Sequence, residues 1–168
     1  MSLPRLFTAC LVLVFAFTAG ACASSKKKKD YETAVVRFMF ESNGREVAGT
    51  ARLPRSGTVI SIAPKAQFTE YDIKRCGVVQ NEFGPSLMFE LTAEAAKDLF
   101  RTTATSQGRR IVTVINGRPV GAARINAPLG QGIIVTYVEL DDADLEKLAK
   151  DITRTSEDLR EELEKKTQ

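Results

Sequence analysis

Two apolar runs separated by Asn116-Gly117 place the tightest constraint on how this chain can fold. Residues 111–115 read IVTVI, and a second largely apolar run covers residues 120–125. An Asn-Gly pair between such runs favours a two-residue type I′ turn, because both turn residues must adopt a positive φ that asparagine and glycine tolerate. The sequence therefore predicts an antiparallel β-hairpin that turns at Asn116 and Gly117.

Other stretches rich in β-branched and aromatic residues predict further strands around this hairpin. These strands are expected at residues 33–41, 47–53, 58–63, 86–91 and 133–140, with a short capped turn of helix at residues 69–73. Gly108 precedes the hairpin, and Gly130-Gln131-Gly132 separates it from the last strand. We interpret these glycines as turn residues, because glycine reaches backbone conformations that other residues avoid.

Two helices are expected. Thr92 is a candidate N-cap for a helix over residues 93–102, in which the apolar residues up to Phe100 fall on one face. A second helix is expected to follow Asp141-Asp142, with an apolar stripe that ends at Ile152. For residues 153–168 we expect a charged, solvated helix rather than a coiled coil with a partner, because the apolar spacing breaks down there.

The expected fold class is α+β: a single domain, mainly an antiparallel sheet with one or two packed helices. The length of 168 residues allows one domain with a substantial core. A composition of 43% hydrophobic and 27% charged residues is typical of a globular protein. We place this domain at residues 33–152.

The N-terminal residues follow a different pattern. Arg5 precedes an uncharged, largely apolar stretch at residues 6–21, shorter than the roughly 20 residues that span a bilayer. Such a stretch with small residues at its end is typical of a secretory signal peptide. Residues 19–22 (AGAC) resemble the lipobox of bacterial lipoproteins, in which the cysteine is lipidated. We therefore expect a signal peptide at residues 1–21 and a lipid on Cys22; ordinary cleavage at an A-x-A site and an uncleaved anchor are the alternatives.

Residues 22–32 are expected to be a flexible, lipid-anchored tether. Residues 24–29 read SSKKKK, and like charges in such a polar segment repel each other. Lysines beside a lipid would also be attracted to anionic headgroups, at about 1 kcal/mol each, but we favour the simpler interpretation of a solubilising spacer. The lipid makes the membrane the first expected partner, in the bacterial cell envelope and facing the periplasm or the exterior.

Reactive residues are scarce, which argues against an enzyme. The chain contains no histidine, which excludes histidine triads and histidine-ligated metals. Cys76 is the lone cysteine of the predicted domain. Its neighbours Lys74 and Arg75 would favour a thiolate, but without a histidine base we interpret Cys76 as a small buried hydrophobe.

Motifs for cofactors are incomplete. Gly130-Gln131-Gly132 lacks the third glycine of a dinucleotide loop and the lysine of a phosphate-binding loop. Asp141, Asp142 and Asp144 lack the glycine and the distal glutamate of an EF-hand loop. A net charge of +3, without a basic stripe interleaved with aromatic residues, does not indicate nucleic-acid binding. We expect no catalytic residue, cofactor or metal.

An ordered set of segments within residues 60–132 matches a known family. In chain order these segments are Phe68-Thr69, Asp72-Ile73, residues 86–91, LTAEAAKDLF at 91–100, GRRIVTVING at 108–117, Pro119-Val120, Ala122, Ile125 and PLGQG at 128–132. Together they resemble the periplasmic head subdomain of the SecD family, protein-export membrane proteins that work with SecF beside the Sec channel. The resemblance implies that Thr92, Phe100, Gly108, Asn116, Gly117, Gly130 and Gly132 are fold-determining positions.

The chain also departs from the family pattern. Ala95 stands where the family usually carries glycine, and a charged helix follows Lys150 where the family leads back to the membrane. SecD couples proton flow through its transmembrane helices to movement of the head. The resemblance therefore implies the fold and a surface role near emerging polypeptides, without a proton-driven motor.

Two functions are compatible with these observations. The first is a membrane-tethered, non-catalytic, SecD-head-like lipoprotein that contacts unfolded or membrane-bound polypeptide, or Sec components, near the export machinery. Exposed strand edges would pair with an extended chain by β-augmentation. The alternative is a structural envelope lipoprotein or scaffold that reuses the fold and docks through its C-terminal helix, because a fold alone does not decide function.

Overall fold

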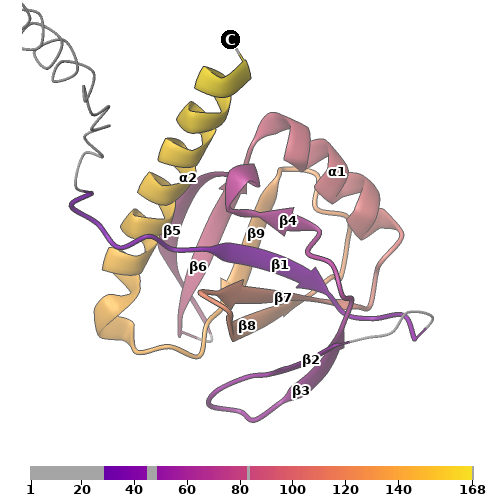
Figure 1. The fold of residues 1–168 in the computed structure, drawn as a ribbon. Coiled ribbons are helices and arrows are strands. Elements are labelled where there is room, and N and C mark those ends of the chain that lie inside the picture. The colour runs from indigo at the N-terminus through magenta and orange to yellow at the C-terminus, as the bar shows by residue number, and fades with distance from the viewer. Residues whose placement is uncertain (1–28, 45–48, 83, 168) are drawn as a thin grey trace, which may run out of the picture. The chain divides into compact units, whose positions relative to one another are not determined.

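The hairpin at Asn116-Gly117 forms as predicted (Figure 1). β7 (Arg110–Ile115) and β8 (Arg118–Arg124) are antiparallel, and Ile115 pairs with Arg118 across a two-residue loop. Asn116 has a φ of 49° and Gly117 a φ of 77°. Two successive positive φ angles are what a type I′ turn requires, so the prediction is confirmed.

The computed structural model describes residues 29–44, 49–82 and 84–167, and the residues from Tyr31 onward form one compact unit. The strands are β1 (Val36–Phe40), β2 (Gly49–Arg52), β3 (Val59–Ile62), β4 (Phe68–Thr69), β5 (Ile73–Asn81), β6 (Gly84–Leu91), β7, β8 and β9 (Ile133–Tyr137). The helices are α1 (Ala93–Ala104) and α2 (Leu145–Thr167), with 3₁₀ turns η1 (Glu70–Asp72) and η2 (Asp142–Asp144). None of the helices in these ranges is long and apolar enough to cross a membrane. The predicted signal peptide and Cys22 lie outside the described residues.

All strand pairs are antiparallel and form three sheets. A four-stranded sheet has the order β4-β1-β7-β8, a three-stranded sheet has the order β5-β6-β9, and β2 and β3 form a separate hairpin. A bridge between Gly121 and Val138 connects the two larger sheets. With two helices packed on these sheets, the predicted α+β class is confirmed.

The main core lies between the four-stranded and three-stranded sheets. The rings of Phe38 on β1 and Phe89 on β6 meet edge to face, with centroids 5.0 Å apart and an interplanar angle of 85°, a geometry that aromatic pairs favour. Gly121 allows the close approach of β8 to the end of β9, because a Cβ there would lie 2.1 Å from the Tyr137 carbonyl oxygen.

α1 begins at the predicted cap, but one side chain is placed differently. The backbone of Thr92 is extended, and its hydroxyl oxygen accepts a hydrogen bond from the Ala95 nitrogen at 3.4 Å, as an N-cap does. Ala95 and Leu99 are buried, whereas Phe100 is 48% exposed. The predicted inward position of Phe100 is therefore wrong. α1 packs through Ala95 and Leu99, which are four residues apart, and the next residue along a helix points about 100° away from that side.

α2 remains part of the packed structure beyond Ile152. Thr155 and Ser156 are completely buried. The Thr155 hydroxyl accepts a hydrogen bond from the Ala34 nitrogen at 3.0 Å and donates one to the Asp151 carbonyl at 2.7 Å. The expectation of a solvated helix from residue 153 is therefore wrong for this part. Small side chains let the helix approach closely, and the Thr155 hydroxyl satisfies its own polar group through these two bonds.

β5 is absent from the sequence prediction. Lys74, Arg75 and Gly77 interrupt its apolar alternation, so its period-2 pattern is weak. Pairing with β6 and coverage by α2 stabilise it instead (Figure 1). The Cys76 nitrogen donates to the Thr153 hydroxyl at 2.9 Å.

Candidate functional site

The outer face of the four-stranded sheet, opposite the main core, is only half covered. Strand register places two rows of residues across β1, β7 and β8 on this face: Arg37, Val114 and Pro119 in one row, and Met39, Val112 and Ala122 in the other. Ala51, Leu53 and Ile60 of the β2–β3 hairpin form an apolar cluster with Val112. The hairpin therefore covers the second row and leaves the first row more open.

Glu139 holds the tip of the β2–β3 hairpin. Its Oε2 accepts hydrogen bonds from the backbone nitrogens of Arg55 at 2.6 Å and Ser56 at 2.8 Å. The Arg55 guanidinium also pairs with Asp141 at 2.6 Å. Desolvation, the largest single influence, raises the pKa of Glu139, but the hydrogen bonds from Ser56 and Arg55 together hold that pKa below its usual value. The carboxylate is therefore ionised at neutral pH and acts as an anchor.

The base of the hairpin is held by β1. The Ser42 nitrogen donates to the Ser61 carbonyl, and the Ala63 nitrogen to the Phe40 carbonyl, each at 2.8 Å. Next to this junction, the Glu41 carboxylate pairs with Arg110 at 2.5 Å. The side-chain hydrogen bond from Arg110 holds the pKa of the Glu41 carboxyl below its usual value. The hairpin is thus fixed at both ends.

A groove of about 490 Å³ lies beside the hairpin on this outer face. It is lined by Val35, Arg37, Met39, Thr50, Ile62, Val114, Asn116, Gly117 and Pro119. Most of these side chains are apolar, and Arg37 is the charged one among them. Thr50 and Ile62 come from the hairpin and the others from β1, β7, β8 and their flanking residues.

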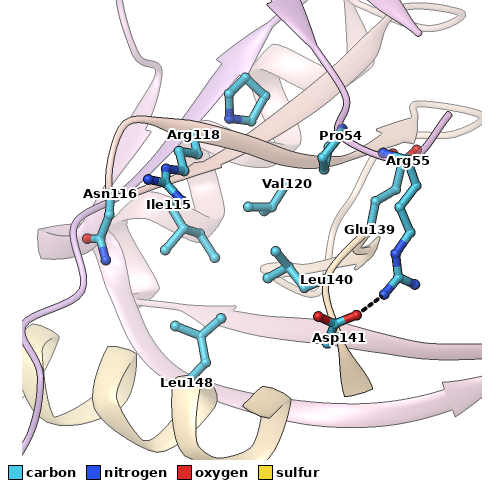
Figure 2. A pocket seen from close by; sticks show the side chains of 11 residues that line it. Pro54, Arg55, Ile115, Asn116, Arg118, Val120, Glu139, Leu140, Asp141 and Leu148 are labelled. Carbon is cyan, nitrogen blue, oxygen red and sulfur yellow. Dashed lines mark hydrogen bonds and ion pairs between the residues drawn. The ribbon is translucent and has the colours of Figure 1, made fainter. Parts of the chain in front are cut away.

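A pocket of about 600 Å³ continues on the other side of the β7–β8 turn. Figure 2 shows apolar side chains in its centre, from Ile115, Val120, Leu140 and Leu148, with the Arg55–Asp141 pair on one side and Asn116 and Arg118 on the other. Asn116 and Pro119 line both the groove and the pocket. The two halves lie on opposite faces of the β7–β8 hairpin, because Ile115 and Val120 belong to the main core whereas Val114 and Pro119 lie on the outer face. We call the two together the outer groove. Each half has a volume within the range of ligand-binding pockets, which is about 300–1,000 Å³.

Two cations that line the outer groove have no acidic partner among the residues that the structure describes. Arg55 is paired with Asp141, but Arg37 and Arg118 make no ion pair or side-chain hydrogen bond with any residue in the described part of the chain. Unpaired guanidinium groups beside apolar side chains favour a ligand that carries both apolar groups and a carboxylate.

Only two of the predicted fold-determining residues belong to this site. Asn116 and Gly117 form the turn between the two halves, and the Asn116 side-chain oxygen accepts a hydrogen bond from the Val35 nitrogen at 2.8 Å. Gly108 has a φ of 82° and donates to the Ile125 carbonyl at 2.8 Å. The remaining described positions, Thr92, Phe100, Gly130 and Gly132, lie at α1 or against it.

The sequence did not lead us to predict Arg37, Arg118 or Glu139 as residues of the site. A signal existed for Arg37, because strand alternation places it opposite Val36 and Phe38. Nothing local marks Glu139, whose partner Arg55 is 84 positions away in the chain.

Cys76 is buried, with 7% of its surface exposed. Desolvation raises the pKa of its thiol to about 12, so the thiol stays protonated at neutral pH. Among the described residues, no group of three or more cysteine or acidic side chains is arranged to hold a metal ion.

Comparisons with known proteins identify the fold. No protein-family model matches the chain, and no curated protein matches its sequence. The structure superposes on SecDF in its super-membrane-facing form with a TM-score of 0.56 and 23% identity, over 71% of this chain and 18% of that chain. The fold is SecD-like. A second structure, of SecDF as a membrane component that enhances protein export, has a TM-score of 0.56 and 21% identity, over 73% of this chain and 63% of that chain. The chain therefore spans less than two thirds of either SecDF chain, and these similarities support the SecD-head-like fold predicted from the sequence.

Proposed function

We propose that this chain is a lipid-anchored, non-catalytic polypeptide-binding protein of the bacterial cell envelope that works near the protein export machinery. Its SecD-like fold supports this function, because one similar structure is described as a component that enhances protein export. The predicted signal peptide and the lipid on Cys22 would keep the domain at the membrane surface.

The outer groove is the observation that carries the proposal. Its half on the outer face combines an apolar floor with Arg37, which has no acidic partner among the described residues, beside a hairpin that is fixed at both ends. Unfolded polypeptides expose apolar side chains, which such a floor can bury. The groove has two open halves rather than one enclosed cavity, which suits a chain more than a small molecule.

The titratable groups support a non-catalytic role. The carboxylates of Glu41, Glu90 and Glu139 accept hydrogen bonds from basic side chains or backbone nitrogens, and each has a lowered pKa. A general acid or base works best with a pKa near the operating pH. These carboxylates are instead ionised at neutral pH and hold structure together.

Photocrosslinking in cells tests this function. A photoreactive amino acid at position 114 in the outer groove is compared with one at position 135 on the exposed face of β9. We expect position 114 to capture secreted chains or Sec components while export is active, and position 135 to capture far less. Capture of neither class from position 114 would contradict the proposal.

The lipid anchor needs a separate test. Mass spectrometry of the mature N-terminus should find acylated Cys22, and Cys22→Ser should move the protein from the membrane fraction to the soluble fraction. An unmodified N-terminus far from Cys22 would contradict the anchor and leave the binding proposal intact.

A scaffold is the second candidate function, favoured by the end of α2. Residues 161–167 are exposed, Leu163 is 48% exposed, and α2 extends past β5 (Figure 1). As a scaffold, the protein would dock another envelope protein on this end. Deletion of residues 161–168 should then reduce the size of the native complex, and an unchanged complex would reject this candidate.

A further inference from the structure

We infer that the outer groove binds an extended polypeptide segment as an added strand on the edge of β2, and prefers segments that carry an acidic residue among apolar ones. This inference rests on the proposed function and specifies its binding mode. It depends on three features of the described residues: the edge of β2, the apolar side chains beside it, and Arg37, which has no acidic partner among these residues.

Strand register shows which backbone groups of β2 are available. The Leu53 nitrogen donates to the Thr58 carbonyl at 2.9 Å, so this pair is hydrogen-bonded across the hairpin. Hydrogen-bonded and non-hydrogen-bonded pairs alternate along antiparallel strands. Thr50 and Arg52 occupy non-hydrogen-bonded pairs, opposite Ser61 and Val59, so their N–H and C=O groups point away from β3.

Independent contacts support this assignment. On β3 the Ser61 carbonyl accepts from Ser42, outside the hairpin, as expected for a residue opposite Thr50. On β2 no residue in the described ranges bonds to the outward backbone groups of Thr50 or Arg52. An exposed strand edge of this kind can pair with another chain.

The edge and the apolar floor are adjacent. Thr50 lines the same half of the outer groove as Met39, Val114 and Pro119. Alternate side chains of a strand point to opposite faces. A segment paired with β2 would therefore direct every second side chain toward this floor and the others toward solvent.

Charge determines which segments fit. Arg37 lies in the half of the outer groove that Thr50 lines, whereas Arg118 lies in the other half, on the core side of the sheet. Arg37 has no acidic partner in the described ranges, and a glutamate or aspartate of the segment would supply one. A lysine would add a second cation beside Arg37, so the groove should discriminate between the two charges.

An acyl chain is the main competing occupant, because it would also cover the apolar floor. An acyl chain has no peptide groups, so the outward N–H and C=O groups of Thr50 and Arg52 would form no hydrogen bonds with it. The strand edge therefore favours a polypeptide, and the experiment includes dodecanoate to detect the other outcome.

Fluorescence polarisation with the full lipidated chain in phosphatidylcholine nanodiscs tests the inference. The probe is a labelled peptide, acetyl-VTVEVTV-amide, compared with VTVKVTV and with a form N-methylated at alternate residues. We expect the glutamate peptide to bind about tenfold more tightly than the lysine peptide, and N-methylation on the paired edge to weaken binding about tenfold or more.

Protein variants localise the interaction. Thr50→Pro removes an outward N–H without breaking a β2–β3 hydrogen bond and should weaken binding about tenfold, whereas Thr50→Ala keeps that N–H and should bind normally. Arg37→Gln should abolish the preference for glutamate over lysine, whereas Arg118→Gln should leave it in place. Thermal unfolding of each variant identifies any general loss of structure.

Two results would each overturn the inference: the N-methylated peptide binds as tightly as the unmodified one, or Thr50→Pro binds the glutamate peptide as tightly as wild type. A third such result is that dodecanoate displaces the peptide while N-methylation has no effect on binding. Failure here is distinguishable from failure of the proposed function. If crosslinking in cells still captures secreted chains while these peptides do not bind, the protein binds polypeptide in another mode.

Discussion

The carboxylate of Glu139 lies 2.6 Å from the backbone nitrogen of Arg55, although the two residues are 84 positions apart in the chain. This contact connects the segment after β9 to the tip of the β2–β3 hairpin. Because the hairpin borders the outer groove, this buried carboxylate helps to fix the position of one wall of the groove.

Glu139→Gln should loosen the hairpin tip without unfolding the protein. The amide keeps one acceptor oxygen but loses the charge that strengthens the bonds from Arg55 and Ser56, which we expect to lower the free energy of unfolding by about 1–3 kcal/mol. Urea denaturation at pH 7 measures this change. Faster hydrogen exchange confined to the hairpin would accompany it.

The effect should depend on pH with a definite sign. The pKa of Glu139 is lower in the folded protein than its usual value, so its contribution is complete above the unfolded pKa and is lost as pH falls through the folded pKa. The difference in the free energy of unfolding between wild type and Glu139→Gln should thus be constant near neutral pH and shrink below about pH 4.5. A difference that grows on acidification would contradict this account.

Two neighbouring glycines should respond differently to alanine. Gly132 has a φ of 68°, and an added Cβ would lie 2.5 Å from the Ala96 Cβ. Gly132→Ala should therefore lower the free energy of unfolding by about 2–4 kcal/mol. At Gly130 the new Cβ would be 3.6 Å from the Phe100 ring, an ordinary van der Waals contact. Gly130→Ala should therefore change the free energy of unfolding by less than about 0.5 kcal/mol. Equal effects would show that this loop is not packed as described.

Truncation should reveal where the domain ends on α2. Removal of residues 161–168 deletes exposed side chains and should shift the melting temperature by less than about 2 °C. Removal of residues 153–168 also deletes the buried Thr155 and Ser156 and should prevent stable folding. If both truncated proteins melt alike, α2 beyond Ile152 contributes nothing to the core.

Cys76 should be unreactive while the protein is folded. Its burial raises the pKa of the thiol to about 12, so almost no thiolate exists at pH 8. Iodoacetamide labelling, followed at the Cys76 peptide by mass spectrometry, should be more than about 100-fold slower in buffer than in urea. Rapid labelling of the folded protein would assign Cys76 to an accessible site.

The parts of the fold that the sequence predicted depend on local chemistry. The turn at Asn116-Gly117 needs two positive φ angles, and the cap at Thr92 needs one hydroxyl, so neighbouring residues were sufficient to find both. β5 was not predicted because its alternation of apolar and polar residues is weak, and pairing with β6 and contact with α2 stabilise it instead.

The candidate site was harder to predict because its parts come from distant segments. Arg37 comes to lie beside Val114 and Pro119 only after β1, β7 and β8 pair. Thr50 joins them only because Glu139 and β1 hold the hairpin in place. Side-chain types alone do not indicate these contacts. The exposure of Phe100 and the burial of Thr155 likewise follow from the exact angle at which each helix packs, which periodicity does not specify.

Chemical-shift mapping by NMR tests the central claim most directly. The full isotope-labelled chain in nanodiscs is titrated with a reduced and alkylated, permanently unfolded polypeptide. Polypeptide binding at the outer groove predicts saturable shifts at the amides of Thr50, Arg52, Val114 and Arg118, with little change at Glu161 and Leu163. No saturable shifts, or shifts confined to the end of α2, would contradict it.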